Sequence, residues 1–262
     1  MMVTVTNVTR PVRPAHRAET TLPQRPERGS ARRRTTHALV VDQIRDMILA
    51  GELKPGDRLR VDELASALGV SPMPVREALH QLAGEGTVTL DPFRGFSIAE
   101  LSAKEAVDLY STRAALETLA ARIAVPRLDE ATLTKLREIL DRQARACRRG
   151  DATEFIHWDL TFHRELYAAS DRPLLTRQVL GLINSSVRYS RANLPLPGAM
   201  EAALAAHRTI FEACERRDAA LAAKVTCQHT EQAAQRVLRL LESRRAAEEP
   251  PAARSRRKVR RA

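Results

Sequence analysis

The chain has 262 residues, which is enough for one large domain or for two modest ones that each bury a core. Hydrophobic residues make up 44% of the chain and aromatic residues only 3%, a composition that favours helices over sheet. No stretch approaches the roughly 18 consecutive apolar residues that a membrane span needs, so we expect no membrane partner.

The formal net charge of +11 is carried by the two ends of the chain. Residues 1–36 and 244–262 each contain eight basic and two acidic residues, so the remainder is close to neutral. Segments this rich in Arg and Pro cannot form a core, and we expect both to be disordered tails. They could add sequence-independent phosphate contacts or only solvate the ends, and net charge alone does not establish DNA binding.

Residues 37–101 show the periodicities of three helices followed by a β-hairpin. The predicted elements are helices near 37–50, 61–68 and 71–85 and strands near 87–90 and 96–98. Ser71 is a good N-cap residue for the third helix, and Pro72 suits the first helical position. This order predicts a winged helix-turn-helix domain whose helix-turn-helix occupies residues 61–85.

Residues 102–243 show no further strand signal. Leu and Ala recur at spacings of three and four, and Pro126, Gly150 and Pro173 are among the breaks. The six predicted helices lie near 102–124, 129–149, 151–170, 173–193, 197–217 and 218–243. The sequence therefore predicts a mainly α protein in which the winged helix-turn-helix precedes an all-α antiparallel six-helix bundle.

The helix at 71–85 carries candidate DNA-reading residues, because the second helix of a helix-turn-helix lies in the major groove with its N-terminal side chains at base edges. Arg76 is the strongest candidate, since a guanidinium can bond guanine O6 and N7 together. Alternatively, Arg76 pairs with Glu77 or Asp62 on a solvated face. Arg94, at the hairpin tip, is placed to enter the minor groove. The predicted DNA-binding residues are Ser71, Met73, Arg76, His80 and Arg94.

Four residues of the predicted bundle have the chemistry of a metal site. Asp159 and His163 are four residues apart, so both project from one face of a helix, and a carboxylate with an imidazole is a reasonable half-site for Zn²⁺, Ni²⁺ or Mn²⁺. His207 and His229 lie on the last two helices, and inward residues of a bundle can converge on one ion. A surface hydrogen bond for the pair, and satisfied core positions for the other histidines, are the alternatives.

Arg113 lies on the apolar side of the first bundle helix, between Leu109 and Leu116. A buried guanidinium needs a partner. One partner is Glu117, four residues along the same helix. The other is a carboxylate ligand held in a fork of two N–H groups.

Two stretches of the predicted DNA-binding domain resemble the GntR family of bacterial regulators. They are residues 48–59 (ILAGELKPGDRL) and 64–79 (LASALGVSPMPVREAL), followed by Leu82, Gly86 and the turn at 94–96. The family usually has Arg after the capping Ser, where this chain has Pro72 and then Met73. The resemblance implies operator binding, and the departure implies an operator that differs from the common pattern.

The bundle resembles the FCD-type effector domain of one branch of that family. The matching residues are 110–117 (YSTRAALE), 159–163 (DLTFH), His207 with 210–213 (IFEA), and His229. The resemblance implies that Asp159, His163, His207 and His229 hold a divalent metal ion at the floor of an effector pocket. It further implies that a small organic acid binds between the metal and Arg113, and Asn193 is a further candidate for lining the pocket.

These features predict a cytoplasmic, nucleoid-associated transcription regulator rather than an enzyme. We expect a homodimer that represses at double-stranded operator DNA through residues 37–101 and is released when a small carboxylate binds to residues 102–243. Direct metal sensing is the alternative within regulation. A metal-dependent hydrolase and an Arg-rich nucleoid protein are the alternatives from other classes, but no residue near the ligands is an evident general base.

Overall fold

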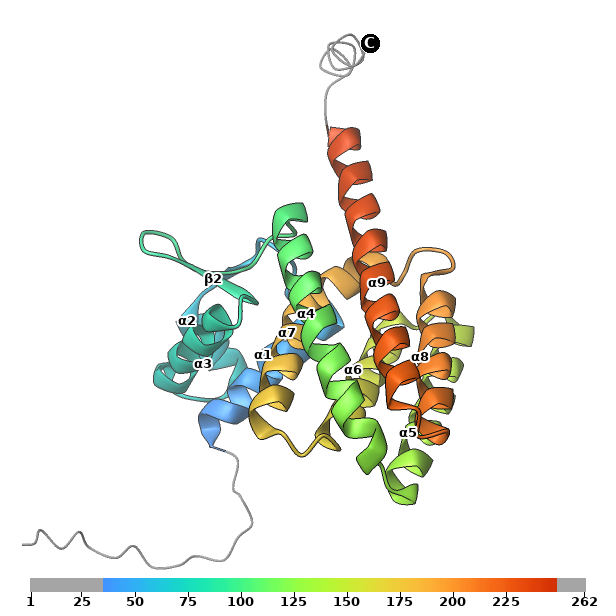
Figure 1. Cartoon of the computed structure of the whole chain (residues 1–262). Coiled ribbons are helices and arrows are strands. Elements are labelled where there is room, and N and C mark those ends of the chain that lie inside the picture. The colour runs from blue at the N-terminus through green and yellow to red at the C-terminus, as the bar shows by residue number, and fades with distance from the viewer. Residues whose placement is uncertain (1–34, 249–262) are drawn as a thin grey trace, which may run out of the picture. The chain divides into compact units, whose positions relative to one another are not determined.

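A computed structural model describes residues 35–248, and the predictions for 1–34 and 249–262 lie outside the described residues. The part that it describes is mainly helical, with three short strands near its N-terminal end (Figure 1). No helix within 35–248 combines the length and the apolar character that crossing a membrane requires.

The N-terminal part forms the expected winged helix-turn-helix. Its elements are α1 (Thr36–Ala50), β1 (Arg58–Leu59), α2 (Val61–Leu68), α3 (Pro72–Gly84), β2 (Val88–Asp91) and β3 (Gly95–Ile98). The antiparallel sheet has the order β1-β3-β2, with Leu59 opposite Phe96 and Val88 opposite Ile98. The pairing of β1 with β3 adds a third strand to the predicted hairpin.

Helix α3 is held by a buried stripe at helical spacing, formed by Val75, Leu79 and Leu82. Ser71 is the N-cap residue of α3, as predicted. Ser71 has the extended backbone of a cap residue, but its hydroxyl forms no capping hydrogen bond. Pro72 occupies the first helical position, where its missing N–H costs nothing.

The C-terminal part is the expected bundle of six α-helices. They are α4 (Ala103–Ala124), α5 (Glu130–Arg149), α6 (Ala152–Ala168), α7 (Pro173–Asn193), α8 (Ala199–Glu215) and α9 (Ala219–Glu248), with a 3-10 turn at Val125–Arg127. Ser102, Asp129 and Asp151 cap α4, α5 and α6, each accepting a backbone N–H three residues ahead. Helix α9 extends five residues beyond the predicted end at 243, and α4 lies along it (Figure 1).

Helix α7 also contacts the DNA-binding domain. The Ser185 hydroxyl and the Arg188 guanidinium donate to the backbone carbonyls of Glu85 and Gly86, just after α3. Arg191 donates to the carbonyl of Ala50 at the end of α1, with an N···O distance of 3.3 Å. A movement of α7 would therefore act on the ends of both helices.

The first prediction concerns the buried stripe of α3. Leu79→Ala should lower the free energy of unfolding by about 2–5 kcal/mol, because it leaves a cavity where a fully buried side chain packs. Met73→Ala, on the same helix but 66% exposed, should change it by less than about 0.5 kcal/mol. Chemical denaturation of both variants measures the difference, and equal losses would contradict the packing described for α3.

Candidate metal centre and DNA-reading face

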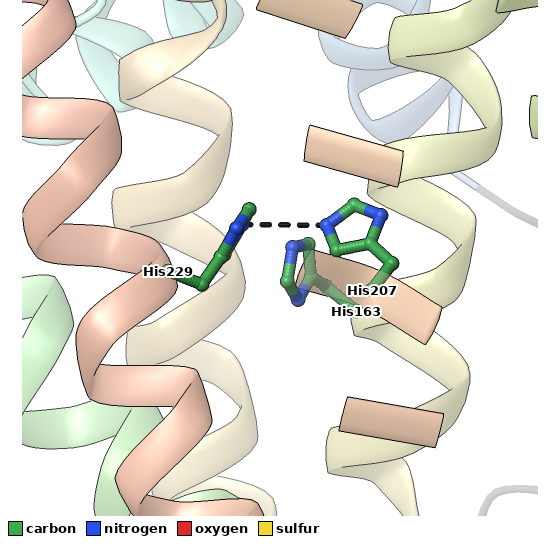
Figure 2. A group of neighbouring side chains, drawn as sticks. All are labelled: His163, His207 and His229. Atoms are coloured by element: carbon green, nitrogen blue, oxygen red, sulfur yellow. Dashed lines mark hydrogen bonds between the residues drawn. The ribbon is translucent and has the colours of Figure 1, made fainter. Parts of the chain in front are cut away.

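Three histidines from three helices meet inside the bundle. His163 comes from α6, His207 from α8 and His229 from α9, and all three are buried. One ring nitrogen of each lies within 4.8 Å of the corresponding atom of the other two. The three rings face one another across the space between the helices (Figure 2). Long-range packing thus brings together the three histidines that the sequence singled out.

Asp159, the fourth predicted ligand, lies one helical turn before His163 and beside His207, whereas the group of mutually close donor atoms contains the three histidines alone. Oδ1 of Asp159 lies 3.3 Å from Nε2 of His207. Burial raises the pKa of this carboxyl to about 7, and the nearby Arg113 guanidinium opposes that rise. A cation beside the carboxyl would favour its ionised form.

The His207 ring is oriented by a residue that sequence reasoning missed. Nδ1 of His207 lies 2.9 Å from Oε1 of Gln143, which can only accept, so Nδ1 carries the hydrogen. The other ring nitrogen, Nε2, then offers its lone pair 3.3 Å from Nε2 of His229. Gln143 is fully buried on α5, on the same stripe as Leu136 and Leu140. A polar Gln within an apolar stripe of the sequence is the signal that could have identified this residue.

Burial keeps these rings uncharged. It lowers the pKa of His207 to about 3, and the pKa values of His163 and His229 are also lowered far below the usual range, with burial as the largest cause. Neutral imidazole is the form that ligates a metal.

The donor set fits a divalent cation. Both ring nitrogens of His163 and Nδ1 of His229 are buried without a hydrogen-bond partner among the described residues. Leaving such groups unpaired costs free energy, and a cation satisfies nitrogen lone pairs that no donor reaches. Three imidazoles and one carboxylate are typical ligands of Zn²⁺, and Ni²⁺ and Mn²⁺ also accept them.

Arg113 adopts the ion pair considered as the alternative. Its Nε donates to Oε1 of Glu117 at 2.8 Å, and Nη1 donates to the Ser186 hydroxyl at 2.7 Å. Oε2 of Glu117 accepts from the Tyr167 hydroxyl at 2.8 Å. Burial alone would lower the pKa of Arg113, but Glu117 and Tyr110 raise it, so the guanidinium stays charged. Among the hydrogen bonds of residues 35–248, two of its five N–H groups are used, which leaves three for a ligand.

Asn193 is buried at the C-terminal end of α7. Among the contacts of residues 35–248, none joins its side chain to the histidine triad. Its assignment to the effector pocket therefore stays a prediction.

The predicted DNA-binding side chains are all exposed. Met73 and Arg76 stand three residues apart on α3, so they share one face. In the described part of the chain, no ion pair joins Arg76 to Glu77 or Asp62. The His80 ring packs edge-on against Phe96 of β3, with the ring centroids 5.1 Å apart. His80 therefore links α3 to the wing, which is the hairpin formed by β2 and β3.

The turn at the wing tip, between β2 and β3, is held by hydrogen bonds to a side chain. Oδ1 of Asp91 accepts the backbone N–H groups of Phe93 and Arg94 at 2.8 and 2.9 Å. Gly95 follows with φ +77°, a left-handed conformation that suits glycine. The turn presents Arg94 to solvent, as the minor-groove prediction requires.

A winged helix-turn-helix joined to an all-α bundle is the architecture of a DNA-binding transcription regulator with a separate helical domain. The model of the gntR family of bacterial regulatory proteins matches residues 36–98, and that of the FCD domain matches residues 108–232. The chain belongs to the GntR family of transcription regulators, which are not enzymes.

Similar proteins and solved structures agree with this family. An uncharacterised HTH-type transcriptional regulator of Bacillus subtilis, YdhC, is 34% identical over 68% of this chain and 80% of its own length. A probable repressor of a D-xylose utilisation operon from Paenarthrobacter nicotinovorans is 30% identical over 75% of this chain and 88% of its own. The Escherichia coli McbR structure shares the fold, with TM-score 0.69, 24% identity and coverage of 79% of this chain and 97% of McbR.

The second prediction concerns the buried ion pair. Glu117→Gln should lower the free energy of unfolding by about 3–5 kcal/mol, because it leaves the Arg113 charge buried without its counter-charge. The double variant Arg113→Met with Glu117→Gln should cost less than the sum of its single variants, because neither charge is then left alone. Additive losses would show that the two side chains are not coupled.

Proposed function

We propose that this chain is a homodimeric repressor that leaves its operator when a small organic acid binds at a metal-containing site in the bundle. The observation that carries the proposal is the buried histidine triad with its unpaired ring nitrogens, next to a charged Arg113. The Paenarthrobacter relative is named as a probable repressor of a D-xylose utilisation operon, and this name supports repression as the mode of action.

The metal would be held by Asp159, His163, His207 and His229. A divalent ion there would supply a positive charge to which a carboxylate can bind. Gln143 keeps Nε2 of His207 free of hydrogen, and Phe162 stacks on the His207 ring with centroids 4.9 Å apart. These contacts hold the ligand in place before the ion binds.

Charge and hydrogen bonding favour an anion beside Arg113. Glu117 already balances the guanidinium, so a divalent ion ligated by the single carboxylate of Asp159 would leave the site with a net positive charge. The three remaining N–H groups of Arg113 can hold a carboxylate. A small organic acid therefore fits the site better than a neutral or cationic ligand does.

Helix α7 offers a route from this site to the DNA-binding domain. Ser186 accepts the Arg113 hydrogen bond, and the adjacent Ser185 donates to the carbonyl of Glu85 after α3. An acid that draws Arg113 away from Ser186 would free one end of this connection. Such a ligand changes operator affinity only through its different affinity for the two states of the protein.

Direct metal sensing is the second candidate, because four protein donors can hold an ion without an acid. The two candidates differ in one respect. A metal sensor changes its operator affinity with metal alone, whereas an acid sensor needs the acid as well.

The third prediction concerns DNA. Arg76→Ala should weaken operator binding by about 1–3 kcal/mol and relax the preference at one base pair, because a bidentate contact to guanine is lost. The exposed Arg122 on α4 provides the control, and Arg122→Ala should leave binding unchanged. Binding titrations with operator variants measure both effects, and unchanged selectivity of Arg76→Ala would refute the role of α3.

The fourth prediction concerns metal. The purified chain should contain about one divalent ion, and His163→Ala or His207→Ala should lose it together with the thermal stabilisation that the metal provides. His157→Ala, which changes an exposed histidine of the same helix as His163, should retain both. Elemental analysis with thermal melts tests this, and a metal-free chain that Zn²⁺, Ni²⁺ and Mn²⁺ all fail to stabilise would rule the site out.

The fifth prediction separates acid from metal. Arg113→Lys keeps the charge and loses the planar fork, so metal content and operator affinity should stay while the response to the acid falls at least about tenfold. A thermal-shift screen of small organic acids with metal present identifies the acid for titration. A variant that responds like the wild type would confine Arg113 to its pairing with Glu117.

A further inference from the structure

The proposed DNA-reading helix carries an exposed apolar side chain near its N-terminal end. Met73 lies in the first turn of α3, and 66% of it is exposed. It shares its face with Arg76, three residues later. The buried stripe of α3 lies elsewhere, at Val75, Leu79 and Leu82, so Met73 contributes little to the core.

The chemistry of methionine limits what it can recognise. A thioether donates no hydrogen bond and accepts only weakly, so it cannot read the polar edges of bases. The apolar group that the major groove presents is the C5-methyl of thymine. Methionine is also unbranched and adaptable, and it packs well against such a group.

We propose that Met73 reads a thymine methyl group in the major groove, beside the base pair contacted by Arg76. This inference rests on the proposed role of α3 in operator binding. The surface is continuous with that DNA-reading face, and the positive charge of Arg76 favours the approach of DNA over that of an apolar protein partner.

The test compares thymine with deoxyuridine, which differs only by the methyl group. The wild-type chain first selects its operator from a random DNA pool, and each thymine is then replaced in turn. At one thymine per half-site, deoxyuridine should weaken wild-type binding by about 3- to 5-fold, as expected for one buried methyl group. Met73→Ala should bind both forms alike, and Met73→Leu should retain most of the discrimination.

The controls separate this inference from the role of α3. Arg76→Ala should keep the thymine discrimination while losing a guanine preference. Selection that depends on Arg76, with no thymine at which the wild type detects the methyl group, would overturn the Met73 inference alone. Discrimination that persists in Met73→Ala would also overturn it. A chain that selects no sequence would overturn both the role of α3 and the inference.

A second exposed apolar side chain, Phe93, lies at the wing tip, and it leads to a separate inference. Phe93 is 98% exposed, yet the backbone beneath it is held by Asp91. A fixed turn that holds an aromatic ring fully in solvent gains nothing for folding. Next to it, Arg94 is also exposed, and its positive charge favours the approach of DNA to the tip.

We infer that Phe93 enters the minor groove and partly unstacks a base step, as apolar wedges do in other DNA-binding proteins. Operator DNA with 2-aminopurine at single positions under the wing should brighten when the wild type binds, because unstacking relieves quenching. Phe93→Leu should retain the signal and Phe93→Ser should lose it. Full brightening with Phe93→Ser, or none with the wild type bound, would overturn this inference.

Discussion

The bundle depends on placing three uncharged imidazoles against one another in a space from which water is excluded. His163, His207 and His229 give up hydrogen bonds to water, and His163 gains none in return among residues 35–248. A fold rarely retains such unpaired groups without a purpose. A divalent ion would offset this cost and hold α6, α8 and α9 together.

The polar groups around the triad form two hydrogen-bonded sets, which approach each other where Nδ1 of His163 lies 3.9 Å from Oε2 of Glu117. Gln143 orients one imidazole, and Glu117 joins Arg113 to Tyr167. Ser186 then links Arg113 to α7, the helix that touches the ends of α1 and α3. Under the proposed function, a ligand beside Arg113 would meet groups that are joined through α7 to the DNA-binding domain.

Much of this architecture follows from local sequence signals. Glycines at helix ends and apolar stripes predicted the winged helix-turn-helix and the six bundle helices. The predicted bounds of these helices lie within a few residues of those in the structure, with ends at Gly51, Gly69 and Gly150. The sequence could not predict that β1 pairs with β3 or that Gln143 contacts His207, because both contacts depend on packing between distant segments. For Arg113 the sequence allowed two partners, and only the packed helix shows it bonded to Glu117. The sequence placed Ser71 correctly at the N-cap of α3, but the residue type alone did not ensure a side-chain capping bond.

X-ray absorption at the zinc edge of the zinc-loaded chain tests the central claim most directly, because it reports the ligands themselves. The account predicts a first shell dominated by imidazole nitrogens, with a carboxylate oxygen, at about 2.0–2.2 Å and with the multiple-scattering pattern of several histidines. The pattern should weaken by one imidazole in His229→Ala. A shell of sulfur at about 2.3 Å, or of water oxygens without imidazole scattering, would show that the metal binds elsewhere and would contradict the account.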